Sequence, residues 1–167
     1  MATGLNSPGL IVWTGICSDG LIGPFFFSDT VTAERYLEML RDKFLPAIAH
    51  RNWNSTYFQQ DGAPAHYGRI VRDWLDTTFP NRWIGRRGPI EWPARSPDLT
   101  PPDFFLWGVL KDKVFAQRPR TISELRKVII QECESIEPQL CQKVVRSVVR
   151  RYNDCIQADG NQFEHLL

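Results

Sequence analysis

The feature that most constrains the fold is a pair of apolar segments separated by a tight-turn signal. Residues 10–17 (Leu-Ile-Val-Trp-Thr-Gly-Ile-Cys) form a short, almost unbroken apolar run, which predicts a strand buried on both faces. Ser18-Asp19-Gly20 comes next, and Asp-Gly between apolar runs is a strong hairpin signal. Residues 21–27 are the expected returning strand, so the first folded element should be a β-hairpin.

Helical and strand patterns then alternate along the chain. Apolar residues recur at three- and four-residue steps from Tyr36 to Ile48, which predicts a helix capped by Thr30 or Thr32. Residues 55–60 are aromatic and short, and they end at the chain-reversing group Asp61-Gly62-Ala63-Pro64. We therefore expect a strand there, followed by a loop.

The rest of the chain is expected to be mostly helical. A helix should span about 67–79, and residues 82–102, rich in Arg, Trp, Gly and Pro, should hold at most one short strand. Three further helices should start at Asp103, at the capping box Thr121-Ile-Ser-Glu124, and at Pro138. The order β-β-α-β-α-(β)-α-α-α predicts an α/β fold, a mixed sheet flanked by helices.

Bulk properties exclude several classes of protein. No run approaches the ~20 apolar residues of a membrane span, and residues 1–8 do not resemble a secretory signal, so we expect an intracellular protein. The four cysteines form no Cys-x-x-Cys pair, and no histidine is spaced to complete a zinc site. We expect free thiols.

Basic residues gather in two clusters although the net charge is only +1. The first cluster contains Arg82, Arg86, Arg87 and Arg95, and the second contains Lys143, Arg146, Arg150 and Arg151. Each could be a solvated face or a surface that contacts phosphates.

Carboxylates stand where local structure should expose them. Asp61 directly follows an expected strand, Asp98 lies in a Ser-Pro-Asp-Leu segment, and Asp103 begins a helix, where the dipole favours negative charge. Two aspartates from distant segments repel each other unless a cation joins them, and Mg²⁺ prefers such oxygens together with water and phosphates. The alternative is that Asp61 caps a turn and Asp103 caps a helix.

Two long motifs carry a resemblance to a known family. The block 57–66 (Tyr-Phe-Gln-Gln-Asp-Gly-Ala-Pro-Ala-His) closely resembles the block around the second catalytic aspartate of mariner-like transposases. The block 92–107 resembles the one around the third acidic residue, which here is Asp103, so Asp98 looks structural. The similarity covers about residues 9–160, and we interpret residues 1–167 as a single partial DDE/DDD catalytic domain of a transposable-element-derived protein.

This resemblance implies a fold, an activity and partners. The fold is ribonuclease-H-like, and the activity is metal-dependent DNA strand cleavage and transfer with Mg²⁺ or Mn²⁺. Asp61 and Asp103 would be catalytic metal ligands. The partners would be transposon-end and target DNA and a possible second copy of the chain, in the nucleus, with no membrane or small-molecule substrate.

Four further residues are candidates for DNA contact. His66 could lie near the metals or touch DNA, although a plain polar role at the turn is an equal alternative. Arg86, Arg87 and Arg95 would lie in the loop between the two aspartates, where they could meet phosphates.

The family's first catalytic aspartate and its strand have no counterpart here. In the family that strand precedes the Val-Trp-x-Gly-Ile strand, whereas here only residues 1–9 come before it, and they hold no acidic residue. We also expect residues 1–167 not to include the family's N-terminal helix-turn-helix region. We therefore expect an N-terminally truncated chain that lacks its central strand, binds metal weakly, and has an unpaired apolar edge beside the strand ending at Asp61.

Three interpretations of the chain follow. It could be a transposase domain that is active only within a longer protein, because Asp61 and Asp103 alone would have to do the work of three metal-binding carboxylates. It could be a non-catalytic nucleic-acid-binding remnant or domesticated fragment. It could also be a decayed copy.

Overall fold

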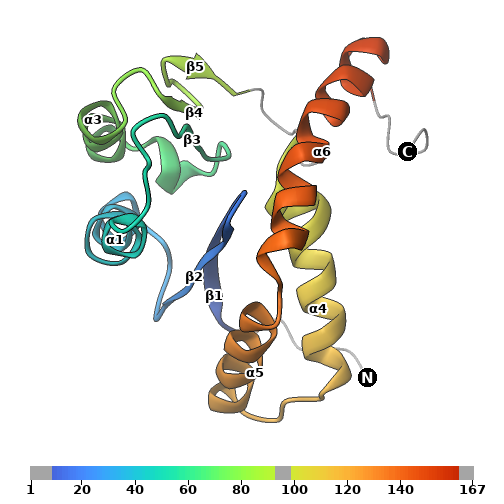
Figure 1. Ribbon diagram of the computed structural model, residues 1–167. Coiled ribbons are helices and arrows are strands. Elements are labelled where there is room, and N and C mark those ends of the chain that lie inside the picture. Colours follow the sequence, from blue (N-terminus) through green and yellow to red (C-terminus); the bar gives the residue numbers. More distant parts are fainter. Residues whose placement is uncertain (1–8, 93–98, 162–167) are drawn as a thin grey trace. The chain divides into compact units, whose positions relative to one another are not determined.

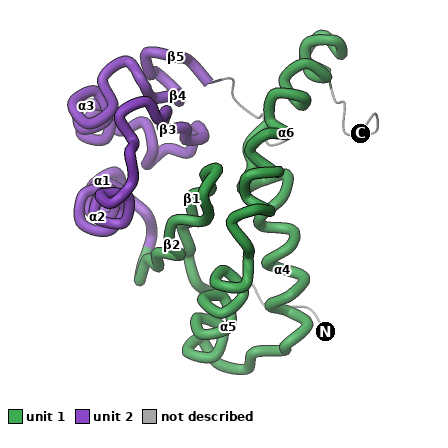
Figure 2. Tube along the Cα trace, in the orientation of Figure 1, with its two compact units in different colours: residues 1–29, 98–167 green, residues 30–97 purple. Residues whose placement is uncertain are grey.

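The chain forms two compact units in this computed structural model, which describes residues 9–92 and 99–161. Unit 1 comprises residues 1–29 and 98–167, and unit 2 comprises residues 30–97 (Figure 2). Unit 2 is therefore one continuous stretch inserted between the two segments of unit 1. Our interpretation of a single domain stays a prediction, and each unit is described by itself below.

Unit 1 opens with the predicted hairpin. Strands β1 (Ile11–Cys17) and β2 (Gly20–Phe27) pair in antiparallel fashion, with Cys17 opposite Gly20 and Ile11 opposite Phe27 (Figure 1). The register shifts between Trp13 and Gly15. The expectation that the first strand is buried on both faces is wrong, because Thr14 alone is buried in β1. A two-stranded hairpin offers too little sheet to cover both of its faces.

Helices complete unit 1. They are a π-helical segment η4 (Pro102–Leu106), α4 (Trp107–Ala116), α5 (Ile122–Glu134) and α6 (Pro138–Gln157). Thr121 caps α5 as predicted, since its hydroxyl accepts a hydrogen bond from the Glu124 amide at 3.1 Å. The Glu124 carboxylate returns to the Arg120 amide at 2.7 Å, one residue before the position that the capping box assigns.

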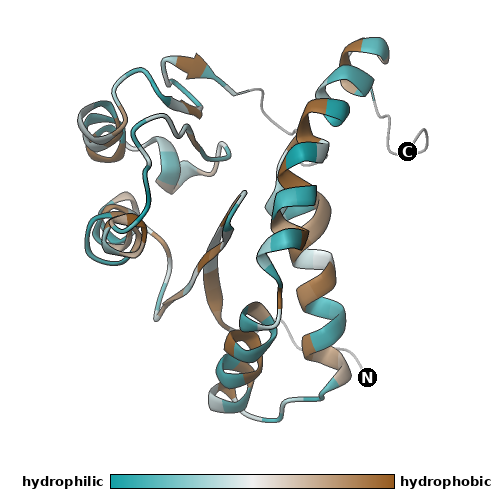
Figure 3. Cartoon of the chain, in the orientation of Figure 1, coloured by the Kyte–Doolittle hydropathy of each residue, from teal (hydrophilic) through white to brown (hydrophobic). Residues whose placement is uncertain are grey.

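The core of unit 1 joins these helices to the hairpin. Its buried side chains come from η4, α4, α5 and α6 and from the turn before α6: Leu106, Leu110, Cys133, Ile136 and Cys141. Partly buried Ile16 and Leu21 of the hairpin pack against them. The hydrophobic positions of α6 recur along its whole length (Figure 3), yet Val149 and Ile156 are 65% and 72% exposed.

Unit 2 begins with an interrupted helix. Thr32 caps α1 (Ala33–Met39), accepting from the Arg35 amide at 3.3 Å. A π-helical segment η1 (Leu40–Phe44) and α2 (Leu45–Ile48) follow. The π-helical turn was not predicted. The expected stripe is buried at four positions: Tyr36, Leu40, Phe44 and Ile48.

A small parallel sheet lies in unit 2. Strand β3 (Phe58–Gln59) pairs with β4 (Trp83–Gly85), which pairs with β5 (Ile90–Glu91). A 3₁₀ turn η2 (Pro64–Tyr67) and helix α3 (Arg69–Thr78) connect β3 to β4. The strand predicted over 55–60 is thus much shorter, and two short strands replace the single one expected.

Two further expectations concern the free edge of β3 and the state of the cysteines. In the described part of the chain, β3 pairs only with β4, so its other edge carries no strand, where we expected an unpaired edge. All four cysteines are free thiols, as predicted. No helix among the described residues is long and apolar enough to cross a membrane.

Candidate active site

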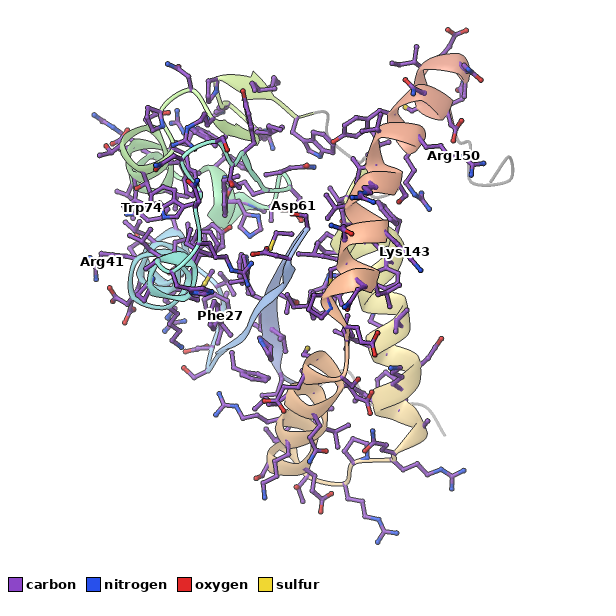
Figure 4. The ribbon with its side chains drawn as sticks, in the orientation of Figure 1. Phe27, Arg41, Asp61, Trp74, Lys143 and Arg150 are labelled. Atoms are coloured by element: carbon purple, nitrogen blue, oxygen red, sulfur yellow. The ribbon has the colours of Figure 1, made fainter. Side chains whose placement is uncertain are left out.

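Asp61 lies immediately beyond the carboxyl end of strand β3. The Gln60 amide donates to the Ile84 carbonyl at 3.0 Å, which extends the pairing with β4 up to the residue before Asp61. The chain then turns through Gly62 and Ala63, and the Asp61 side chain is 54% exposed. Figure 4 labels it on the loop after β3. Carboxyl ends of parallel strands are where ligands bind in open α/β sheets.

Two groups hold the Asp61 carboxylate. Oδ1 lies 2.6 Å from Nδ1 of His66 and accepts a hydrogen bond from the Ala63 amide at 3.0 Å. Nδ1 of His66 is buried, and its short contact with Asp61 does not have the geometry of a normal hydrogen bond. The contact with His66 is the main cause of a lowered Asp61 pKa; burial opposes it, and the Ala63 amide adds to it. The carboxylate is therefore ionised at neutral pH.

Both the ring and the backbone of His66 are held by neighbouring residues. Its ring stacks on Tyr36 of α1, with centroids 4.2 Å apart. Its carbonyl accepts a hydrogen bond from Nε2 of Gln60 at 2.7 Å, and Oε1 of Gln60 accepts from the Tyr36 hydroxyl at 3.1 Å. Tyr36 and Gln60 are both buried. Tyr36 was expected only as a member of the apolar stripe, and no role was predicted for Gln60. A polar residue at the end of an apolar strand is the sequence signal that could have indicated one.

Two of the three arginines predicted to meet phosphates lie on the turn between β4 and β5. Arg86 and Arg87 are exposed, and their guanidinium carbons lie 4.4 and 5.4 Å from the centroid of the Tyr67 ring. Sequence analysis did not select Tyr67. Arg95, the third predicted arginine, lies outside the described residues, as does Asp98.

Asp103 lies in unit 1, in the first turn of η4, and is exposed. One of its carboxylate oxygens accepts a hydrogen bond from the Thr100 hydroxyl. π-Helical turns are rare and are frequent at functional sites. The ring centroid of Phe104, the next residue, lies 3.8 Å from the guanidinium carbon of Arg151 on α6.

Each unit thus carries one of the two predicted carboxylates. Among the described residues, no group of three or more His, Cys, Asp or Glu side chains could hold a metal ion. The predicted roles of Asp61, Asp103, His66, Arg86 and Arg87 remain predictions.

The relatives that sequence comparison finds among characterised proteins are all named as transposases. No family model matches the chain. The Tc3 transposase of Caenorhabditis elegans is 28% identical over 158 residues, which is 93% of this chain and 46% of that protein. The Tcb1 transposase of Caenorhabditis briggsae is 28% identical, covering 90% of this chain and 52% of that protein. The chain therefore spans about half the length of these relatives.

Solved structures agree in fold. The catalytic domain of the Mos1 mariner transposase superposes with a TM-score of 0.80 at 24% identity. A Mos1 catalytic domain solved with raltegravir and Mn gives 0.80 over 93% of this chain and 78% of that one. Mos1 in its paired-end complex with Mn also gives 0.80, over 98% of this chain and 49% of that one.

These comparisons establish the fold of the chain and the class of protein that it resembles. The chain has the ribonuclease-H-like α/β fold that we predicted, which the likeness to the Mos1 catalytic domain confirms. The predicted resemblance to the catalytic domain of mariner-like transposases is confirmed as well, because the relatives found by sequence are the Tc3, Tcb1 and Mos1 transposases.

Proposed function

We propose that this chain is part of a domain that cuts and joins DNA strands with divalent metal, and that Asp61 and Asp103 supply two of its metal-binding carboxylates. The observation that carries the proposal is the setting of Asp61: an ionised, half-exposed carboxylate at the carboxyl end of a parallel strand. The relatives named as transposases support the same activity.

The residues present fit Mg²⁺ or Mn²⁺. Both ions prefer oxygen ligands, and Mg²⁺ commonly takes one or two carboxylates and completes its shell with water and substrate phosphates. Oδ2 of Asp61 has no protein partner in the described part of the chain, while Oδ1 is held by His66 and Ala63. Mos1 has been solved with Mn and with Mg.

The chain's own residues orient these carboxylates. Metal ions held by Asp61 and Asp103 would supply activation of an attacking oxygen and stabilisation of a leaving oxygen at a phosphodiester. His66, stacked on Tyr36, fixes the direction of the Asp61 carboxylate. The Thr100 hydroxyl does the same for Asp103. Orientation of this kind spares the free energy that a mobile ligand would lose on binding.

Residues 1–167 alone should nonetheless bind metal weakly and cut DNA slowly. Residues 1–10 contain no aspartate or glutamate that could act as a third ligand. The absence of one ligand should leave the transition state less stabilised, and each ~1.4 kcal/mol corresponds to tenfold in rate.

Metal binding tests the role of the two carboxylates directly. Titration with Mn²⁺, followed by electron paramagnetic resonance, should show a weak site in the unaltered chain that Asp61→Asn and Asp103→Asn each weaken further. The matched control is Asp73→Asn, an exposed aspartate of α3 that contacts Arg69 at 3.8 Å. Equal Mn²⁺ affinity in all four proteins would overturn the proposal.

Nicking of supercoiled DNA tests the activity. A chain extended before β1 by a strand that carries an aspartate should nick DNA in Mg²⁺, and Asp61→Asn in that protein should abolish nicking. If the extended chain binds metal but never nicks, the catalytic proposal fails.

A non-catalytic DNA-binding role is the second candidate. The basic cluster on α6 favours it, because Lys143, Arg146 and Arg150 are all exposed. Figure 4 labels Lys143 and Arg150 on this helix. Mos1 transposase has been solved in a paired-end complex with its left transposon end. By analogy with Mos1, we propose that this chain also binds DNA. Salt-dependent binding of duplex DNA without nicking by the extended chain would favour this second candidate.

A further inference from the structure

The turn between β4 and β5 is built to project two arginines. The Gly88 amide donates to the Gly85 carbonyl at 3.0 Å, which closes a four-residue turn with Arg86 and Arg87 at its centre. Arg87 has a φ of 60°, a left-handed conformation that costs a non-glycine residue about 1–2 kcal/mol. Strain of this kind is most often found where a side chain has a function.

The base of this turn is rigid. A Cβ atom at Gly88 would lie 2.6 Å from the buried Trp83 ring, so the backbone there is packed directly on the indole. Nε1 of Trp83 donates to Asp76 of α3 at 2.8 Å. The backbone amide of Arg87 donates to the Glu91 carboxylate at 3.0 Å. The positions from which the two arginine side chains leave are therefore fixed.

Both guanidinium groups are then held by a single aromatic ring. The Tyr67 centroid lies 4.4 Å from the Arg86 guanidinium carbon and 5.4 Å from that of Arg87. Within the described residues, neither guanidinium makes an ion pair with a carboxylate. Two positive charges therefore lie together at the surface, positioned by cation–π contact, and among the described residues neither forms an ion pair.

Arg86 of this pair passes close to the residue after Asp61. A Cβ atom at Gly62, the residue after Asp61, would lie 3.7 Å from Cδ of Arg86, so the Arg86 side chain passes over that glycine. Tyr67 directly follows His66, whose ring contacts the Asp61 carboxylate. The carboxylate and the two guanidinium groups thus belong to one continuous part of unit 2.

We propose that Tyr67, Arg86 and Arg87 form a clamp for backbone phosphates of DNA next to the carboxylate of Asp61. This inference rests on the proposed function and adds its substrate contact. Planar guanidinium groups match phosphate oxygens in pairs of hydrogen bonds. The ring is already covered by guanidinium groups, which favours phosphate contact over stacking of a base. Holding both arginines in advance reduces the side-chain entropy lost on binding.

DNA binding in EDTA tests the clamp without any metal. Fluorescence anisotropy on a duplex, repeated over a range of salt concentrations, gives the slope of log affinity against log salt. The double variant Arg86→Gln/Arg87→Gln should reduce the magnitude of this slope by about 2, because each lost phosphate contact removes about 0.9. The matched control is Arg41→Gln/Arg69→Gln, two exposed arginines of unit 2 that contact no aromatic ring within the described part of the chain. The slope of this control should stay unchanged.

The aromatic platform needs its own variants. Tyr67→Leu should weaken binding about fivefold, since two surface cation–π contacts are lost, while Tyr67→Phe should stay within about twofold of the unaltered chain. Arg86→Lys/Arg87→Lys should keep the salt slope but bind more weakly, because the charge remains and the planar fork is lost. Melting temperatures show whether each variant is folded.

Several outcomes would overturn the clamp. These are no salt-dependent binding by the unaltered chain, an equal slope change in the control double variant, or affinity of folded Tyr67→Leu equal to that of Tyr67→Phe. Variant effects that depend strongly on DNA sequence would indicate base contacts instead and would also reject it. Failure of the carboxylate proposal appears separately, as Mn²⁺ binding unaffected by Asp61→Asn.

Discussion

The imidazole of His66 stacks on the phenol ring of Tyr36, with centroids 4.2 Å apart and planes inclined by 28°. This contact joins the loop after β3 to helix α1, two segments that are distant in sequence. Because His66 also lies 2.6 Å from the Asp61 carboxylate, the helix helps to position the residue that we propose as a metal ligand. The stability and titration of this region should therefore depend on Tyr36 and His66.

Tyr36→Phe should keep the stacking and lose the hydrogen bond to Gln60. Oε1 of the buried Gln60 then has no donor from the phenol, so unfolding should cost about 1–3 kcal/mol less. Chemical denaturation followed by tryptophan fluorescence measures this. The control is Tyr57→Phe, which alters an exposed phenol; equal stability of the two variants would contradict the network.

The lowered pKa of Asp61 makes a contribution to stability that depends on pH. A carboxyl whose pKa falls on folding stabilises the protein above its unfolded pKa, near 4, and this contribution disappears as the pH falls through the folded pKa. The stability difference between the unaltered chain and Asp61→Asn should thus shrink between about pH 5 and pH 2. Because Asp61 is half exposed, screening should keep the effect below about 1 kcal/mol.

The cause of that shift can be measured at the carboxyl itself. His66→Ala should return the Asp61 pKa toward its ordinary value, as read by NMR titration, since contact with His66 is its main cause. Tyr36→Phe, which retains the imidazole, should leave it low. An unchanged Asp61 pKa in His66→Ala would exclude the histidine contact.

Relief of the strain at Arg87 should raise the stability of unit 2 and lower its affinity for DNA. Arg87→Gly should stabilise unit 2 by about 0.5–1 kcal/mol, because relief of the left-handed φ exceeds the entropy cost of glycine. The same change should weaken DNA binding. Arg86→Gly is the control: Arg86 is not in the left-handed region, so glycine there should destabilise. Thermal melts of both variants decide between these outcomes.

The four thiols should differ sharply in reactivity. Burial raises the pKa of Cys133 to about 11 and also raises that of Cys141, while Cys17 and Cys155 are only partly buried. With a disulfide reagent at pH 8, Cys133 should react more than about 100-fold more slowly than Cys155, because the thiolate is the reactive form. Denaturant should remove the difference; equal rates in the folded chain would mean that α5 and α6 do not pack as described.

Local patterns predicted the elements of the fold well where side-chain spacing decides them. The Asp-Gly turn gave the hairpin, and the capping threonines Thr32 and Thr121 lie where the sequence indicated. The strand at residues 55–60 shrank to Phe58–Gln59 because its length depends on the neighbour available for pairing, which local sequence does not reveal. The π-helical turns at Leu40–Phe44 and Pro102–Leu106 have no simple periodic signal.

The candidate site was predictable only in part. Asp61, Asp103 and the arginine pair were predicted from local patterns together with motif resemblance, and His66 from the resemblance; their roles stay predictions. Their partners Tyr36, Gln60 and Tyr67 were not predicted, because each contributes through a contact made in three dimensions. Tyr36 is separated from Gln60 by 24 positions, and its place in an apolar stripe concealed its hydroxyl. Tyr67 looked like an ordinary helix-start residue until Arg86 and Arg87 were seen against its ring.

Unit 2 is a single continuous stretch, whereas unit 1 needs both ends of the described chain. During synthesis, residues 30–97 can therefore fold as soon as they emerge, while the hairpin must wait for η4, α4, α5 and α6 to be made. We expect the surroundings of Asp61 to be assembled before those of Asp103. Until then Ile16 and Leu21 lack their core partners, which makes the interval between the two folding events the period of greatest exposure to chaperones and proteases.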